Sequence, residues 1–439
     1  MNNKIPQSPT NMWINSVALL VVFIVLWGLK YFKPEITVIQ AAMLICIALA
    51  LPIIILEWVC LKPYKRASAT IRLQRNGKWN PNRALTKLLG FYIIIALVAM
   101  IYWLFPEYEG SFYNHYYNFL SIIIWPVCLF AIPYFFILDR FMVSPNDEYW
   151  HLGALFSGRF HQVDFHKVMQ LFLGWLVKLF FLPLMFVYLV KQTSFIYNFD
   201  FNSLFSSYKA FYDFSYALMF FIDLLFVTVG YLCTIRLFDS HIRSTDSTLL
   251  GWGSALVCYQ PFWGMISGSY LDYQSSATWG YWFADSAMYT IWGSLILLLI
   301  AIYVWATLPF GIRFSNLTHR GILTNGPYRY CKHPAYVSKN LSWWLISMPF
   351  ITTGDTTDAI RQSILLLLLN GIYFIRARTE ERHLSWDNHY VEYAKYIEEH
   401  GIFSFLGKWF PILKFKRGYL LNLNQDKATD FNSNNRTNL

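Results

Sequence analysis

Two short polar segments in the C-terminal third of the chain carry residue types that could do chemistry. The first runs from Thr324 to Tyr336 and packs a glycine, two prolines, a histidine, two cations and three tyrosines beside an apolar run. Pro334 suits the first turn of a helix, where no backbone N–H partner is needed. The free N–H groups and positive dipole of such a helix end favour a carboxylate or phosphate. An interfacial belt of tyrosines with snorkelling cations is the alternative interpretation.

The second segment runs from Arg376 to Leu384 and places the adjacent carboxylates Glu380 and Glu381 among three arginines. Carboxylates accept hydrogen bonds from hydroxyl groups or from an ammonium group. The alternative interpretation is a solvated, charged helix start. Aromatic and charged residues alternate at helical spacing over 386–398, which predicts an amphipathic helix lying on the membrane surface.

In order, the two segments resemble the motif set of the isoprenylcysteine carboxyl methyltransferase family, and phospholipid methyltransferases share a similar pattern. The resemblance covers about 316–400, roughly a fifth of the chain. The family commonly has Arg at the position of Lys332 and Gly at the position of Ser338. The matching pieces are Gly-Pro-Tyr-x-x-x-x-His-Pro-x-Tyr from Gly326 to Tyr336, a short helical hairpin, Arg-x-Arg-Thr-Glu-Glu from Arg376 to Glu381, and the pair Tyr390 and Tyr393.

The resemblance implies an integral-membrane methyltransferase that uses S-adenosylmethionine and acts on a lipid-like or isoprenoid-like acceptor at the cytoplasmic face. Its catalytic residues would be His333, Glu381 and Arg376. A carboxylate acceptor needs no base, whereas an amine or hydroxyl acceptor needs one, and His333 or Glu381 would serve. Carried over by position, the cofactor-binding residues would be Tyr328, Lys332, His333, Pro334, Tyr336, Arg378, Glu380 and Glu381.

The elements that position these segments are predicted from apolar runs. The chain has 439 residues, of which 56% are hydrophobic and 14% charged. Soluble domains carry about 25% charged residues, so a soluble enzyme, a disordered chain and a secreted disulfide scaffold are excluded. Because a spanning helix needs about 20 apolar residues, we predict an all-α polytopic membrane protein with about ten transmembrane helices. The predicted spans are 13–32, 37–61, 88–105, 118–138, 168–190, 212–236, 248–268, 286–308, 336–352 and 359–377.

Loop charges predict the orientation, because cytoplasmic loops are enriched in Lys and Arg. Loop 62–87 holds eight basic residues and loop 309–335 holds four, and neither holds an acid. Alternation then places the N- and C-termini, and both polar segments, in the cytoplasm. The net charge of +10 is therefore a sign of membrane topology, and we expect no nucleic-acid partner. Residue usage indicates a bacterial inner membrane.

Three regions are expected. Residues 1–308 form an N-terminal eight-helix membrane region of unknown role. Residues 309–416 form a methyltransferase-like core with a helical hairpin and an amphipathic surface helix. Residues 417–439 are polar and rich in Asn, which is typical of a disordered tail. The oligomeric state stays open.

Two charged residues inside predicted spans, Lys178 and Asp223, form a second candidate site. They fall near the same depth of antiparallel helices and are expected to pair, either as an ion pair between helices or as a polar acceptor pocket. A proton path is a third interpretation. Loop 139–167 contains His151, His161, Asp164 and His166, but without an i, i+4 pair of histidines we predict no metal site.

Two other functions compete with methyl transfer. Sterol- or isoprenoid-type NADPH-dependent double-bond reductases are distantly similar at the C-terminus. Their pattern has Asn after the histidine and Asp-Glu in place of Glu-Glu, so Pro334 and the pair Glu380–Glu381 favour methyl transfer. The non-enzymatic alternative is a membrane transporter or scaffold.

Overall fold

The structure, a computed structural model, describes residues 5–32, 34–72, 79–274, 277–284 and 286–415. Within these ranges, eight helices are long and apolar enough to cross a membrane. The prediction of an all-α, multi-pass membrane protein is confirmed. The eight helices are α1 (Met12–Phe32), α2 (Val38–Leu56), α3 (Pro81–Leu104), α4 (Asn114–Phe141), α6 (Phe165–Asn198), α7 (Tyr208–Leu232), α11 (Ala287–Thr307) and α13 (Thr356–Leu384).

Two predicted spans take another form. The continuous helix predicted over 248–268 is broken into α8 (Leu249–Leu256) and α9 (Phe262–Ser267). Turns separate the two, and Pro261 precedes α9 without a backbone N–H to continue α8. The ninth predicted span is α12 (Pro334–Ser347), whose 14 residues fall short of the roughly 20 that a perpendicular span needs.

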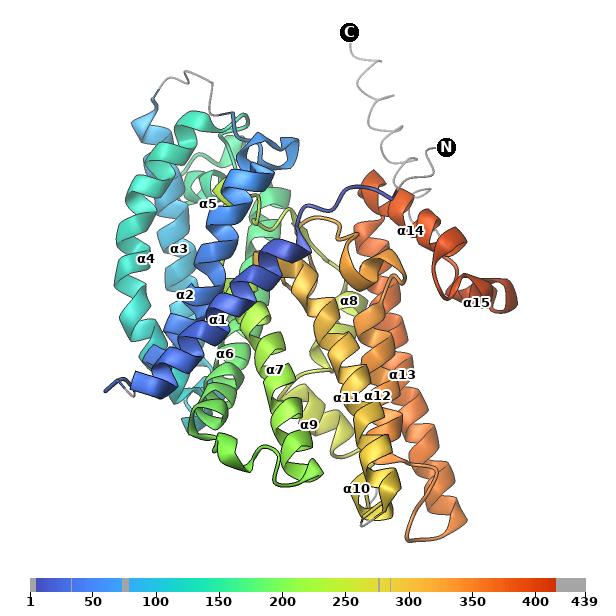
Figure 1. Cartoon of the computed structure of the whole chain (residues 1–439). Helices are drawn as coiled ribbons and strands as arrows, with labels where there is room; N and C mark the ends of the chain where they lie inside the picture. Colours follow the sequence, from blue (N-terminus) through green and yellow to red (C-terminus); the bar gives the residue numbers. More distant parts are fainter. Residues whose placement is uncertain (1–4, 33, 73–78, 275–276, 285, 416–439) are drawn as a thin grey trace.

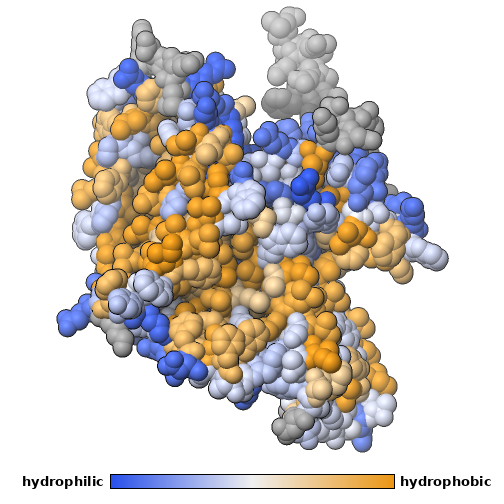
Figure 2. All heavy atoms as spheres, viewed as in Figure 1, coloured by the Kyte–Doolittle hydropathy of each residue, from blue (hydrophilic) through white to orange (hydrophobic). Residues whose placement is uncertain are grey.

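The chain passes back and forth between two ends of a bundle (Figure 1). One end carries α5 (Glu148–Phe156) and α14 (Asn388–His400), and the opposite end carries α10 (Trp279–Trp282). Figure 2 shows a broad hydrophobic surface between more hydrophilic ends. The first and last described residues lie at the α14 end, because Ile5 and Phe415 pack on one cluster there. The first and last described residues therefore share one end of the bundle, as expected, and the cytoplasmic assignment of that end stays a prediction.

Close helix packing in the N-terminal region depends on small residues. A Cβ atom at Gly90 of α3 would lie 2.1 Å from the carbonyl oxygen of Tyr149. One at Gly153 of α5 would lie 1.8 Å from the carbonyl oxygen of Thr86. In lipid no hydrophobic effect drives helices together, so their association depends on close van der Waals packing. Glycine therefore brings the backbones of α3 and α5 together.

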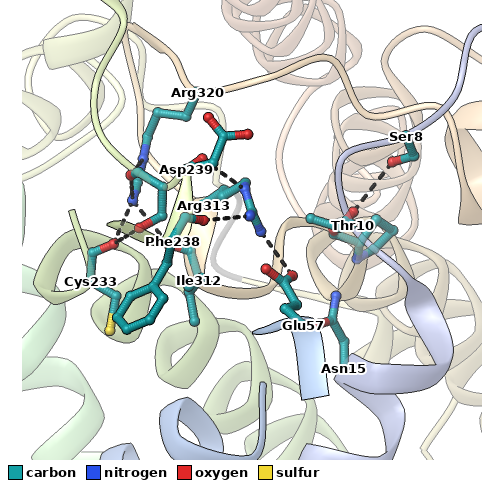
Figure 3. A network of polar contacts seen from close by, with 12 residues as sticks. Ser8, Thr10, Asn15, Glu57, Cys233, Phe238, Asp239, Ile312, Arg313 and Arg320 are labelled. Carbon is teal, nitrogen blue, oxygen red and sulfur yellow. Dashed lines mark hydrogen bonds and ion pairs between the residues drawn. The ribbon is translucent and has the colours of Figure 1, made fainter. Parts of the chain in front are cut away.

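Buried arginines join the N-terminal helices to the segment 309–320 (Figure 3). Arg313 pairs with Glu57, at the end of α2, at 2.8 Å and donates to the carbonyl oxygen of Phe238 at 2.9 Å. Arg320 donates to five backbone carbonyl oxygens and so caps the end of α7, where orphan carbonyls need partners. Those carbonyls belong to Gly230, Cys233, Ser240, Ile312 and Phe314.

Two further contacts hold the same segment. The hydroxyl of Thr10 donates to the carbonyl oxygen of Pro309 at 2.6 Å. Strand β1 (Ser244–Thr245) pairs antiparallel with β2 (Thr318–His319). The segment after α11 is thus held by the N-terminal segment on one side and by β1 on the other.

The apolar face of α14 is turned to the protein. Tyr390, Tyr393 and Ile397 are buried against Ile322. The aromatic stripe predicted for a membrane-surface helix therefore packs on the loop that leads to α12. The predicted tail over 417–439 lies outside the described residues.

Candidate functional site

A cavity lies where the two polar segments meet. Its empty volume is about 1450 Å³, including space open to solvent. Its wall combines the start of α12, the end of α13, α8, α11, α14 and the segment 313–323. The sequence-predicted residues that line it are Tyr328, Lys332, His333, Tyr336, Arg376 and Glu380.

Tyr336, in the first turn of α12, joins the two predicted segments. Its ring stacks on that of His333, with centroids 5.6 Å apart and an interplanar angle of 8°. Its hydroxyl donates to Glu380 at 2.9 Å, and the guanidinium of Arg376 lies 5.3 Å from its ring centroid. Pro334 occupies the first turn of α12, as predicted. The helix therefore begins between His333 and Tyr336, the two residues that stack on each other.

Glu381 is held by two cations and by the ring of His333. Lys332 lies 2.8 Å and His333 3.1 Å from one carboxylate oxygen, and Arg378 lies 2.7 Å from the other. The residue is 5% exposed and is not part of the cavity wall. Buried ion pairs of this kind hold elements in register, and removal of one partner is costly. Glu381 thus ties the loop before α12 to α13.

Arg376 differs from Arg378 because it faces the cavity with neutral partners. It donates to the amide oxygen of Asn316 at 2.7 Å and to the hydroxyl of Tyr259 at 3.4 Å. Its guanidinium also lies 5.5 Å from the ring of Tyr259 and 5.9 Å from that of Tyr373. No carboxylate of the described residues pairs with it, so its charge is available to an anionic group.

Several residues that complete the cavity were missed in the sequence. Lys339, one helical turn after Tyr336, lies over the rings of Tyr303 and Tyr373 at 5.5 and 5.8 Å. Because residues three apart share a helix face, its spacing from Tyr336 is a sequence signal that identifies it as a cavity residue. Tyr259 and Asn316 carry no local signal, because only the tertiary structure brings them to Arg376.

In the sequence, Tyr390 was identified only as part of a motif. The structure places this residue in the cavity wall. The residue lines the cavity and is 4% exposed. Among the described residues its hydroxyl oxygen has no hydrogen-bond partner. Burial, and secondarily the charges of Glu381 and Glu380, raise the pKa of Tyr390 well above its usual range. The hydroxyl therefore stays protonated and can donate to a ligand.

Lys178 and Asp223 do not form the predicted pair. Asp223 accepts hydrogen bonds from Tyr303 at 2.8 Å and Thr307 at 2.5 Å, both on α11. Lys178 donates to Thr234 and lines a different cavity. The physical reason is helix rotation, because α7 turns Asp223 to α11 whereas α6 turns Lys178 to the segment after α7.

His151 and Asp164 of loop 139–167 have structural partners. Nδ1 of His151 accepts a hydrogen bond from the backbone N–H of Asp164 at 3.1 Å. The side chain of Asp164 caps α6 by accepting from the N–H of His166 at 3.0 Å. In the described ranges, no group of three or more His, Cys, Asp or Glu side chains could hold a metal ion.

A family model for the isoprenylcysteine carboxyl methyltransferase (ICMT) family matches residues 289–386. The match begins within α11, earlier than the predicted 316, and contains both polar segments. It confirms the resemblance for this part of the chain and supports a membrane methyltransferase. Neither the search of curated proteins nor that of solved structures found a match.

Proposed function

We propose that the cavity binds S-adenosylmethionine and a lipid-like acceptor and transfers a methyl group between them. The observation that carries the proposal is the linkage through Tyr336, which contacts both Glu380 and Arg376. A carboxylate, a hydroxyl and a cation with neutral partners are thereby gathered at one cavity. The family match over the same residues supports this reaction class.

The residues present fit this cofactor. Glu380 uses one carboxylate oxygen for Tyr336, and its charge suits an ammonium or ribose hydroxyl groups. The hydroxyl of Tyr390 has no partner in the described structure, and Arg376 suits a carboxylate. When bound, S-adenosylmethionine supplies a methyl group already activated by its sulfonium. The protein then mainly needs to orient the acceptor.

We assign Glu381 a positioning role, because Lys332 and Arg378 each occupy one of its oxygens. His333 is the better candidate for a general base where the acceptor is an amine or a hydroxyl. Its ring is held between Glu381 and Tyr336. We further propose that the cavity faces the cytoplasm of a bacterial cell, since the described parts of the two basic loops lie at the end of the bundle where α14 lies (Figure 1).

The test is direct binding of S-adenosylmethionine, and separately of NADPH, to the purified full chain in detergent. Glu380→Gln removes the charge and keeps the size, and we expect at least about tenfold weaker S-adenosylmethionine binding from loss of a charged hydrogen bond. Glu392→Gln, at an exposed position of α14, is the control and keeps wild-type affinity. Wild-type protein that binds NADPH but not S-adenosylmethionine would instead support the reductase.

The acceptor is then sought by incubating the protein with labelled S-adenosylmethionine and membrane extracts. Label in the organic phase identifies a lipid acceptor. Label confined to polypeptide would contradict the lipid-like acceptor while leaving methyl transfer intact.

A further inference from the structure

A second cavity lies between α4, α5, α6 and the segment 234–244, and it shares no wall residue with the candidate methyl-transfer cavity. Its empty volume is about 680 Å³, including space open to solvent. Part of its wall is apolar, with Phe135, Leu171 and Trp175 among its members. The family match does not reach any of these residues.

The rest of the wall is charged, and its carboxylates are already paired. Glu148 pairs with Arg236 at 3.1 Å. Asp147 pairs at 3.7 Å with Lys87, which is not part of the wall. The acidic groups of the wall therefore have their own counter-ions. The charged wall residues are Asp147, Glu148, Lys178, Arg236 and Arg243.

Three basic side chains of the same wall have a charge or a hydrogen-bonding atom that no residue of the described structure pairs with. Lys178 donates to Thr234 and has no carboxylate within ion-pair distance. Arg243 pairs with Asp239 at 3.2 Å through a terminal nitrogen, while its buried Nε has no partner. His241 is 9% exposed, and its Nδ1 also has no partner. An unpaired buried polar group destabilises the folded protein, so a ligand that pairs with these groups is bound more tightly.

We propose that this second cavity binds a phosphate group, with Lys178 as its counter-ion and Arg243 and His241 as hydrogen-bonding partners. A phosphate offers several acceptor oxygens and so can satisfy donors from different sides. The apolar part of the wall suits hydrocarbon attached to that phosphate. The cavity lies beside the start of α5, at the end of the bundle (Figure 1), where lipid head groups lie when the bundle spans a membrane.

The second cavity is separated from the first by the β1–β2 pair. Ser244 lines the second cavity and Thr318 lines the first, and both belong to this two-stranded ladder. The hydroxyl of Ser244 lies 3.3 Å from Nε2 of His383, which also lines the first cavity. The phosphate site is therefore a neighbour of the candidate methyl-transfer site and does not depend on its function.

The experiment measures binding to delipidated full-length protein by native mass spectrometry, with three probes. Phosphatidylglycerol carries a phosphate and acyl chains, diacylglycerol carries the chains alone, and inorganic phosphate carries the anion alone. We expect phosphatidylglycerol to bind and diacylglycerol not to bind. Competition by inorganic phosphate would show that the anion alone suffices, whereas no competition would show that a lipid is the source. Equal binding of diacylglycerol, or no binding of either phosphate probe, overturns the proposal.

Variants of one residue locate the site. Lys178→Met keeps the length of the side chain and should weaken phosphatidylglycerol binding at least about tenfold, as expected for loss of a charged partner. Lys178→Arg keeps the charge and should retain binding. Lys191→Met changes an exposed lysine of the same helix and is the matched control. Unchanged affinity in folded Lys178→Met contradicts the proposal.

A measurement on the wild-type protein guards against a variant that fails to fold. Phosphatidylglycerol bearing a photoreactive diazirine should label peptides from α4 and α6 that line the second cavity. Labelling confined to other helices would show that the lipid binds elsewhere and would contradict the assignment of the site to the second cavity.

Discussion

At the scale of single residues, the candidate site is organised by a tyrosine rather than by the charged residues that first indicated chemistry. The hydroxyl of Tyr336 reaches Glu380, while its ring contacts His333 and Arg376. Glu381, which the sequence placed beside Glu380 as an equal candidate, instead pairs with Lys332 and Arg378 and lies 3.1 Å from Nε2 of His333. Adjacent residues on a helix point about 100° apart, so one carboxylate faces the cavity while its neighbour does not.

This arrangement predicts a modest, specific effect of Tyr336→Phe. The substitution removes one hydrogen bond to Glu380 and keeps the ring that contacts His333 and Arg376. We expect S-adenosylmethionine affinity to fall by about 2- to 10-fold, the range that follows from a net 0.5–1.5 kcal/mol per hydrogen bond. Isothermal titration measures it. Tyr330→Phe, at an exposed position, should match wild type, and a Tyr336→Phe variant that also matches it would remove Tyr336 from the site.

At the scale of elements, buried arginines anchor the loop between α11 and α12 to other parts of the chain. Arg320 is 3% exposed and satisfies carbonyl oxygens at the end of α7 and in the segment before β2. The left-handed Gly311, with φ at 53°, lets the chain turn sharply before Arg313. A residue with a side chain at Gly311 would also meet the amide of Asn15 at 2.8 Å.

Arg320→Met should therefore destabilise the protein about as strongly as the loss of a buried ion pair would. Several buried carbonyl oxygens would lose their donor at once, and each unsatisfied group costs about 1–3 kcal/mol. We expect a total of roughly 3–5 kcal/mol, the range for removing one partner of a buried ion pair. Thermal unfolding in detergent measures the change. Arg329→Met, at an exposed position, is the control, and equal melting temperatures for the two variants would refute the capping role.

At the scale of the whole molecule, the region matched to the family is not self-sufficient. Arg313 depends on Glu57, Arg320 on carbonyls that follow α7, and Arg376 on Tyr259. All of these partners lie outside residues 289–386. The first 288 residues thus supply walls and anchors of the candidate site, whatever further role their own cavity has.

A fragment of residues 286–439 should consequently fail to bind S-adenosylmethionine. It would expose the donors of Arg313 and Arg320 without their partners and lack the α8 wall of the cavity. The fragment is expressed, solubilised in detergent and analysed by size-exclusion chromatography and by the same binding measurement. Co-expression of residues 1–285 with the fragment is the control and should restore binding. A monodisperse fragment that binds with full-length affinity would show that the N-terminal region is dispensable for cofactor binding.

The sequence by itself determined the class of fold and the two polar segments. Spanning helices are readable from local composition because lipid demands long apolar runs with internally bonded backbones. The motif pieces are readable because each lies within a few residues. Tertiary structure alone decided which side chains meet: Tyr259 and Asn316 reach Arg376, while Lys178 and Asp223 turn to different partners. The rotation of the helices and the break between α8 and α9 determine these contacts, and both depend on packing between helices that are distant in the chain.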